Sequence, residues 1–140
     1  KEFSFEMAHA LHNYDGPCRN IHGHSYHLFV TIIGEPIEDT SNPKNGMLMD
    51  FGNLKNLVNK EIIDPFDHSL VISGNDPRKE EMVALFENVI FCDYQPTCEN
   101  LVVDFANRIQ KKLPRNLKVH SIKLYETATS YAEWYAQDNQ

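Results

Sequence analysis

Two segments near the start of the chain alternate apolar and polar residues, and this alternation constrains the fold more than any other feature of the sequence. In the first segment, Phe3, Phe5, Met7 and His9 share one side of an extended chain. The same period of two recurs over residues 24–33, which are rich in β-branched and aromatic residues. A period of two is typical of a β-strand with one buried face. We therefore predict two strands that can pair as a hairpin.

The middle of the chain changes to helical spacing, after a loop at residues 34–46 that is rich in Pro and Asn. We predict, in order, a short strand at 46–50, a helix from Asp50 that stops before Pro65, a helix opened by Asp76–Pro77, a brief strand at 89–91 and a helix from Thr97 to Pro114. Two further strands, at 118–127 and 130–136, end the chain. This order predicts an α+β fold, in which an antiparallel sheet of two β-hairpins carries its helices on one face.

Length and composition set the remaining limits. The 140 residues suit a single domain spanning 1–140. No apolar run is long enough to cross a bilayer, and no secretory signal is expected at the start. The net charge of −7, from 13 basic and 20 acidic residues, argues against a general nucleic-acid binder. The odd number of cysteines, three, favours free thiols and a cytoplasmic location.

Five of the seven histidines fall within the first 27 residues. His22 and His24 lie two residues apart, so on one strand their imidazoles project to the same side. His9 ends the apolar face of the neighbouring strand, and pairing of the two strands can bring it beside them. Three imidazoles with an open fourth position are typical of a catalytic Zn²⁺ site. The alternative third ligand is His12, which lies beyond the strand in a loop.

Cys18 precedes His22 by four residues, in a turn that brings it close to the predicted metal. Two roles compete for it on spacing alone. It is either a fourth zinc ligand that closes the site, or a thiolate that acts as a base. Cys92 and Cys98 fall in a strand and in the first turn of a helix, where a buried structural cysteine is the usual case.

Three acidic positions are further candidates for chemistry. Asp67 precedes His68 in a loop, and an adjacent carboxylate can fix the tautomer of a histidine that moves protons. Glu126 ends an apolar strand face, where a carboxylate must be paired or bind a ligand, and it suits the N–H edge of a pterin. Glu99 lies one turn into a helix, where either the helix dipole or a ligand contact accounts for it.

With these residues placed in order, the chain resembles the 6-pyruvoyl-tetrahydropterin synthase family. The resemblance covers nearly the whole chain, and its nearest branch is the bacterial queuosine-pathway form, which makes 6-carboxy-5,6,7,8-tetrahydropterin. Five motifs carry the resemblance: Phe5-Glu-Met-Ala-His9, Cys18-Arg-Asn-Ile-His22-Gly-His24, Phe66-Asp67-His68, Pro96-Thr-Cys-Glu99-Asn100 and Tyr125-Glu126-Thr127. The spacing of three residues between Cys18 and His22 matches the queuosine branch.

The resemblance implies a role for each candidate. His9, His22 and His24 are expected to bind zinc, Cys18 to be the catalytic base, and Asp67 with His68 to form a proton relay. Glu126 is expected to anchor the pterin ring, with Thr97 and Glu99 contributing to the same pocket. The implied architecture is the tunnelling fold, in which trimers close a barrel and pair into hexamers, with active sites between subunits. The segment from Ser73 to Tyr94 is longer than in the shortest members of the family.

The implied activity is a zinc-dependent lyase reaction on 7,8-dihydroneopterin triphosphate, without nucleic acid, membrane or nicotinamide. The product is 6-carboxy-5,6,7,8-tetrahydropterin, with release of acetaldehyde and triphosphate. Two alternatives stay open. One is the 6-pyruvoyl-forming reaction, which stops before the side chain is cleaved. The other is a non-enzymatic zinc-binding module in which Cys18 completes a closed site.

Overall fold

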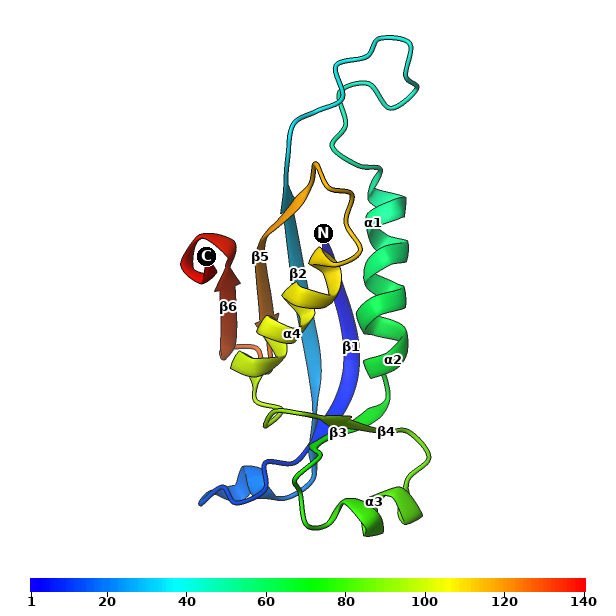
Figure 1. The fold of residues 1–140 in the computed structure, drawn as a ribbon. Coiled ribbons are helices and arrows are strands. Elements are labelled where there is room, and N and C mark those ends of the chain that lie inside the picture. Colours follow the sequence, from blue (N-terminus) through cyan, green and yellow to red (C-terminus); the bar gives the residue numbers. More distant parts are fainter.

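The computed structural model describes residues 1–140, and a curled six-stranded sheet is its central element. The strands are β1 (Glu2–His9), β2 (His22–Ile33), β3 (Ser69–Ser73), β4 (Val89–Cys92), β5 (Lys118–Tyr125) and β6 (Tyr131–Tyr135). Their order in the sheet is β4-β3-β1-β2-β5-β6 (Figure 1). The β1–β2 and β5–β6 hairpins pair antiparallel, which confirms the predicted α+β fold, while β3 and β4 add two parallel strands beside β1.

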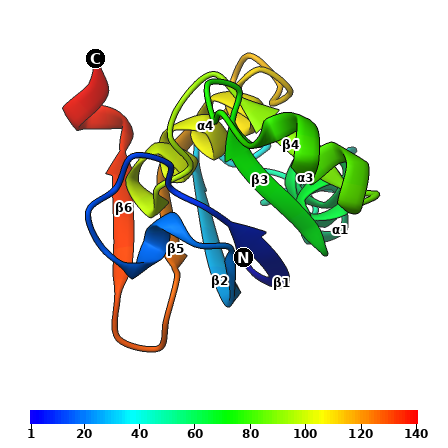
Figure 2. The same cartoon turned by 90° about the horizontal axis from the view of Figure 1, so that it is seen from below.

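Most of the helices lie over one face of this sheet, as Figure 2 shows. They are α1 (Phe51–Val58), α2 (Asp64–Phe66), α3 (Lys79–Leu85) and α4 (Cys98–Gln110). The prediction that all helices lie on one face is wrong for α3, whose Met82 packs with Leu70 and Ile72 on the opposite face of β3. The core of 22 buried residues lies mainly between the sheet, α1 and α4. Two of the three predicted helix caps are present: the Asp50 carboxylate accepts a hydrogen bond from Gly52 N, and the Thr97 hydroxyl accepts one from Asn100 N.

The first helix does not stop before Pro65, and the prediction on this point is wrong. A π-helical turn at Asn59–Ile63 follows α1 and leads into α2, which contains Pro65. In this turn Asp64 N donates to the carbonyl of Asn59, five residues back. The wider turn separates the proline ring from the preceding carbonyls, so the chain continues helically through a residue that ordinarily ends a helix.

Three other local predictions differ from the structure. Residues 46–50 form turns and bends rather than a strand. The helix predicted from Asp76–Pro77 begins later, at Lys79, because residues 77–78 form a turn, in which Arg78 N donates to the Asp76 carboxylate. β3 was not expected, since all five of its residues are buried and it shows no alternation.

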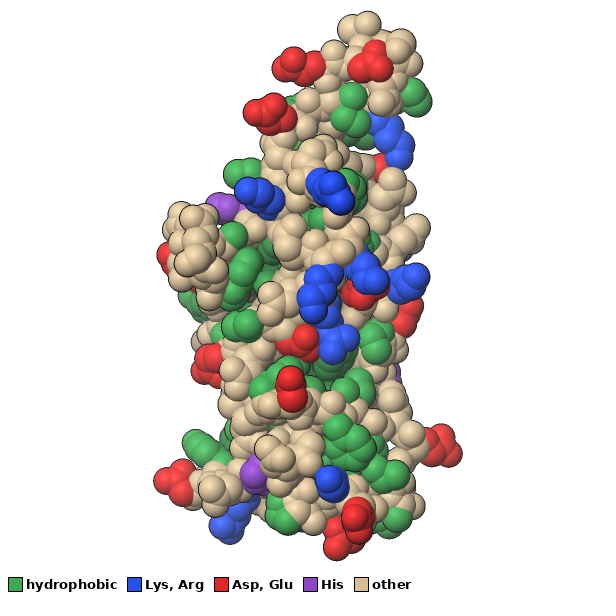
Figure 3. Space-filling view, viewed as in Figure 1, with side chains coloured by type: hydrophobic (Ala, Val, Ile, Leu, Met, Phe, Trp, Pro, Cys, Tyr) green, Lys and Arg blue, Asp and Glu red, His purple; other side chains and the backbone are tan.

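Charge is unevenly distributed over the helical face of the molecule. Figure 3 shows lysine and arginine side chains gathered over its middle, where α1 and α4 lie, and acidic side chains toward both ends. None of the helices has the length and apolarity that crossing a membrane requires.

Candidate metal centre

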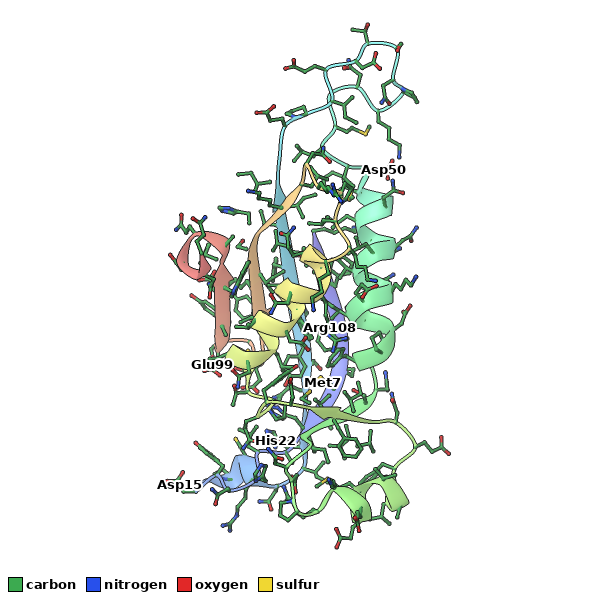
Figure 4. The ribbon with its side chains drawn as sticks, viewed as in Figure 1. Met7, Asp15, His22, Asp50, Glu99 and Arg108 are labelled. Atoms are coloured by element: carbon green, nitrogen blue, oxygen red, sulfur yellow. The ribbon has the colours of Figure 1, made fainter.

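Strand pairing brings the three predicted histidines together at one end of the sheet. His9 lies opposite His22 in the β1–β2 register, and His24 follows on the same face of β2. One nitrogen from each ring lies within 4.8 Å of the other two, so the cluster could hold a metal ion. Figure 4 shows His22 at the end of the sheet from which the loop carrying Asp15 projects, below Glu99 in the first turn of α4.

Backbone carbonyls fix the tautomers of two of these rings. His9 Nδ1 lies 2.8 Å from the carbonyl oxygen of Pro96, and His22 Nδ1 lies 2.8 Å from that of Asn20. A carbonyl only accepts, so both Nδ1 atoms carry the proton and both neutral rings present an Nε2 lone pair. These Nε2 atoms are 3.0 Å apart. Two zinc ligands in a tetrahedral site are about 3.3 Å apart, so the pair fits a shared cation.

The third histidine and a carboxylate complete this arrangement. Nε2 of His24 is buried and has no hydrogen-bond partner. The Oε1 atom of Glu126 lies 3.3 Å from His9 Nε2 and 3.5 Å from His24 Nε2. Burial lowers the pKa of His9 and of His24, which favours the neutral imidazoles that bind metals. The residues present therefore fit a metal ion with an anionic group beside it.

Tyr26 is a component of this site that sequence reasoning missed. Its side chain is fully buried, and its ring packs edge-on against His24 with the ring centroids 5.6 Å apart. The hydroxyl is buried without a hydrogen-bond partner, and burial together with the charge of Glu126 raises the pKa of Tyr26. The signal was available, because Tyr26 continues the face of β2 that carries His22 and His24.

Cys98, which is buried near Glu126, has a structural role, in agreement with the sequence prediction. The Cys98 thiol donates to the carbonyl of Leu124 at 3.3 Å. Burial and the charge of Glu126 raise the pKa of Cys98 to about 12. A thiol with so high a pKa is not a nucleophile or a base near neutral pH.

Cys18 lies in a short 3₁₀ helix, Pro17–Arg19, in the loop between β1 and β2. Its thiol is free and half-buried, and it is not part of the three-histidine cluster. The carbonyl of Cys18 accepts a hydrogen bond from Leu11 N at 2.9 Å, which ties the two sides of the loop together. Cys18 is thus close to the histidine cluster in sequence, but its thiol is not one of the possible metal ligands.

Asp67 and His68 lie in the loop between α2 and β3, and their side chains pair. Oδ1 of Asp67 lies 3.0 Å from His68 Nδ1 and also accepts from Glu6 N at 2.9 Å. The Glu6 hydrogen bond, followed by His68, lowers the pKa of Asp67. His68 has a left-handed backbone, with φ of 56°, and its amide donates to the carbonyl of Glu6. Such strained residues cluster at functional sites.

The His68 ring faces a cleft of about 800 Å³. Residues of β1 and β2 that line the cleft include Glu6, Ala8 and Ser25, and also His24 of the metal cluster. No hydrogen bond or ion pair within the chain joins Asp67 or His68 to Cys18 or to the cluster.

The remaining predicted residues are placed as follows. The Thr97 hydroxyl caps α4. Glu99 is exposed in the first turn of α4 and lines a small cleft between α4 and β6. His12, the alternative ligand, lies outside the cluster, and its carbonyl accepts from Gln95 Nε2 at 2.8 Å. Contacts of Thr97 and Glu99 with a pterin stay predictions.

Comparison with known proteins identifies the class to which this fold and site belong. The family model described as 6-pyruvoyl tetrahydropterin synthase matches residues 1–137. Among solved structures, an uncharacterized protein from Wolinella succinogenes has a TM-score of 0.76 at 21% identity, covering 97% of this chain and 96% of that one. The 6-pyruvoyl tetrahydropterin synthase of Caenorhabditis elegans has a TM-score of 0.69 at 23% identity, covering 97% and 92%. These two structures support the fold.

The chain belongs to the 6-pyruvoyl tetrahydropterin synthase family, and it is an enzyme of the lyase type. Its curated relatives include proteins named for one particular product. The 6-carboxy-5,6,7,8-tetrahydropterin synthase of Haemophilus influenzae is 37% identical over 138 residues, covering 96% of this chain and 95% of the relative. The protein of the same name from Aquifex aeolicus is 35% identical over 127 residues, covering 84% and 75%.

Proposed function

We propose that this protein converts 7,8-dihydroneopterin triphosphate and water to 6-carboxy-5,6,7,8-tetrahydropterin, acetaldehyde and triphosphate, as a step of queuosine biosynthesis. The observation that carries the proposal is the cluster of three imidazoles with Glu126 beside it. Relatives named for this product, similar over nearly the whole chain, support it. The spacing between Cys18 and His22, which matches the queuosine branch, also supports it.

His9, His22 and His24 hold a zinc ion in this proposal. When bound, Zn²⁺ supplies a Lewis acid that polarises the side-chain oxygens of the substrate. The carbonyls of Pro96 and Asn20 keep two of the rings in the metal-binding tautomer, so the site is pre-organised before the ion arrives. Glu126 is the anchor for the N–H edge of the pterin, and its carboxylate is already positioned beside the cluster.

Proton transfer is assigned to Cys18 and His68. Cys18 acts as the base that moves a proton at the first side-chain carbon of the substrate. Asp67 accepts from Nδ1 of His68, which leaves Nε2 as the atom that exchanges protons. The His68 side chain is 78% exposed, so it is accessible to a ligand or to a second chain.

The distribution of these groups supports a site shared between subunits of a trimer or hexamer. Within one chain no hydrogen bond or ion pair joins the relay pair to the cluster, and the exposed His68 is free to reach the metal centre of a neighbouring copy. The sheet has free edges for such an assembly. β6 pairs only with β5, and β1 pairs with β3 only at residues 7–9. A barrel in which β6 of one chain pairs with the unpaired start of β1 of the next covers both of these exposed segments.

The decisive experiment is incubation of the metal-loaded protein with 7,8-dihydroneopterin triphosphate, followed by measurement of acetaldehyde and of the pterin formed. We expect acetaldehyde and the 6-carboxy product in equal amounts. A 6-pyruvoyl pterin without acetaldehyde indicates the alternative reaction. No turnover, combined with loss of zinc and of folding in Cys18→Ala, indicates the non-enzymatic zinc module.

A further inference from the structure

The loop that carries Cys18, residues 10–21, has little structure of its own. Its one regular element is the three-residue helix Pro17–Arg19, and most of its side chains are exposed or half-buried. Inside the loop, the hydrogen bond from Leu11 N to the carbonyl of Cys18 joins the two sides. A base must be placed to within a fraction of an ångström to be efficient, so a loop of this kind needs external support.

Arg78 supplies a contact of this kind directly beside Cys18. Its Nη1 donates to the carbonyl oxygen of Arg19 at 2.9 Å, and Arg19 is the next residue after Cys18. Arg78 precedes α3, in the segment between β3 and β4. The contact spans 59 residues of sequence, so it is purely a product of the tertiary fold.

A buried carboxylate fixes the orientation of the Arg78 guanidinium. The Asp76 side chain is fully buried, and its oxygens accept from Arg78 Nε at 3.0 Å and from Nη2 at 2.8 Å. Its Oδ1 also accepts from Arg78 N at 2.9 Å. Two bonds to one carboxylate hold the plane of the guanidinium rigidly, which leaves Nη1 aimed at the Arg19 carbonyl.

A second contact holds the other side of the same loop. Gln95, which follows β4, donates through Nε2 to the carbonyl of His12 at 2.8 Å. The segment from β3 to α4 therefore contacts the Cys18 loop at two points, the carbonyls of His12 and Arg19. These follow the two residues, Leu11 and Cys18, that the internal hydrogen bond joins. This arrangement supports the backbone of the loop and leaves the Cys18 thiol free.

We propose that Arg78 is a positioning residue, which with Asp76 as its anchor fixes the Arg19 carbonyl and so places the Cys18 thiol for proton transfer. The inference rests on the proposed function, in which Cys18 is the base. It gives the segment between β3 and β4 a role in catalysis at a distance from the metal ligands.

Two variants test the inference without leaving an unpaired buried charge. Arg78→Lys keeps a cation beside Asp76, but a single ammonium group cannot hold both carboxylate oxygens and reach the Arg19 carbonyl. The double variant Asp76→Asn/Arg78→Gln removes both charges, which avoids the cost of an isolated buried carboxylate. The matched control is Arg115→Gln, at an exposed position that makes no hydrogen bond or ion pair.

For both variants we expect kcat with 7,8-dihydroneopterin triphosphate to fall about ten- to a hundredfold, while KM changes less than about twofold. Zinc content should match the wild type. Hydrogen exchange at the Leu11 amide should become faster, because its partner carbonyl belongs to Cys18, while amides of β1 and β2 keep their protection. The control variant should match the wild type in every measurement.

The inference is overturned if both variants turn over like the wild type, or if KM rises while kcat is unchanged, since that pattern assigns Arg78 to substrate binding. Failure of the proposed function gives a different result. In that case the wild type itself forms no product from the pterin triphosphate, and both the proposed function and the catalytic role of Arg78 are rejected.

Discussion

At the scale of single residues, the site depends on three histidine Nε2 atoms that a single metal ion can satisfy together. His9 and His22 bring two Nε2 lone pairs to within 3.0 Å of each other, and Nε2 of His24 is buried with no partner. Such an arrangement is costly without a cation, because buried polar atoms need partners. Glu126 adds the negative charge that a metal or the N–H edge of a pterin can neutralise.

Glu126→Gln separates these two roles of the carboxylate. The amide keeps the shape of the side chain but loses the charge that pairs with the pterin N–H groups. We expect substrate affinity to fall by about 1.5–3 kcal/mol, roughly ten- to a hundredfold, with zinc content unchanged. A binding titration with the pterin and a metal analysis check this. Unchanged pterin affinity contradicts the anchor role, and loss of zinc reassigns Glu126 to the metal.

Asp76 gives a prediction for the acid stability of the fold. Hydrogen bonds from Arg78 lower the pKa of Asp76 below its unfolded value of about 3.9. The carboxylate therefore contributes stability that is complete above about pH 4 and is lost as the pH falls through the folded-state pKa. In Asp76→Asn this contribution is absent, so the unfolding free energy should fall less steeply below about pH 4. Urea unfolding across a pH series measures both slopes, and equal slopes in the two proteins contradict the assignment.

At the scale of elements, the start of α4 links helix stability to the metal centre. The Thr97 hydroxyl caps the helix, and the neighbouring Pro96 carbonyl accepts from His9. The same turn therefore begins a helix and orients a metal ligand. Its sequence signal was the cap residue before an apolar stripe, which located the helix correctly and gave no hint of the contact with His9.

Thr97→Ala removes the cap, and we expect the free energy of unfolding to fall by about 1 kcal/mol. Thr97→Ser keeps the hydroxyl and is the matched control, so it should retain most of the stability. Thermal and urea unfolding of the two variants measure the difference. Equal stability of the alanine and serine variants would show that the cap contributes nothing.

At the scale of the whole molecule, the assembly of the site between chains can be tested by subunit mixing. Cys18→Ala and His68→Ala should each be nearly inactive alone. If His68 acts on the metal centre of a neighbouring chain, random mixing of the two variants restores intact sites at about a quarter of the interfaces. Activity of co-refolded mixtures measures this recovery. No recovery in an oligomer shown to contain both chains places the whole site within one subunit.

The sequence by itself determined the elements whose signals are local. Strand parity identified both hairpins and placed His9, His22 and His24 on faces that could meet, and the caps at Asp50 and Thr97 were predicted correctly. These features depend on residues a few positions apart, so the period of the pattern carries the information.

The tertiary structure alone decided the features that depend on distant contacts. The π-helical turn before Pro65 and the fully buried β3 follow from packing, which overrides local preference. The carbonyls that orient the metal-site histidines, the burial of Tyr26 beside them and the bond from Arg78 to the Cys18 loop join segments far apart in the chain. The cleft that His68 lines together with His24 is likewise formed by segments far apart in the chain. The spacing of residues in the sequence cannot predict these contacts, because they form only when distant segments pack together in the folded chain.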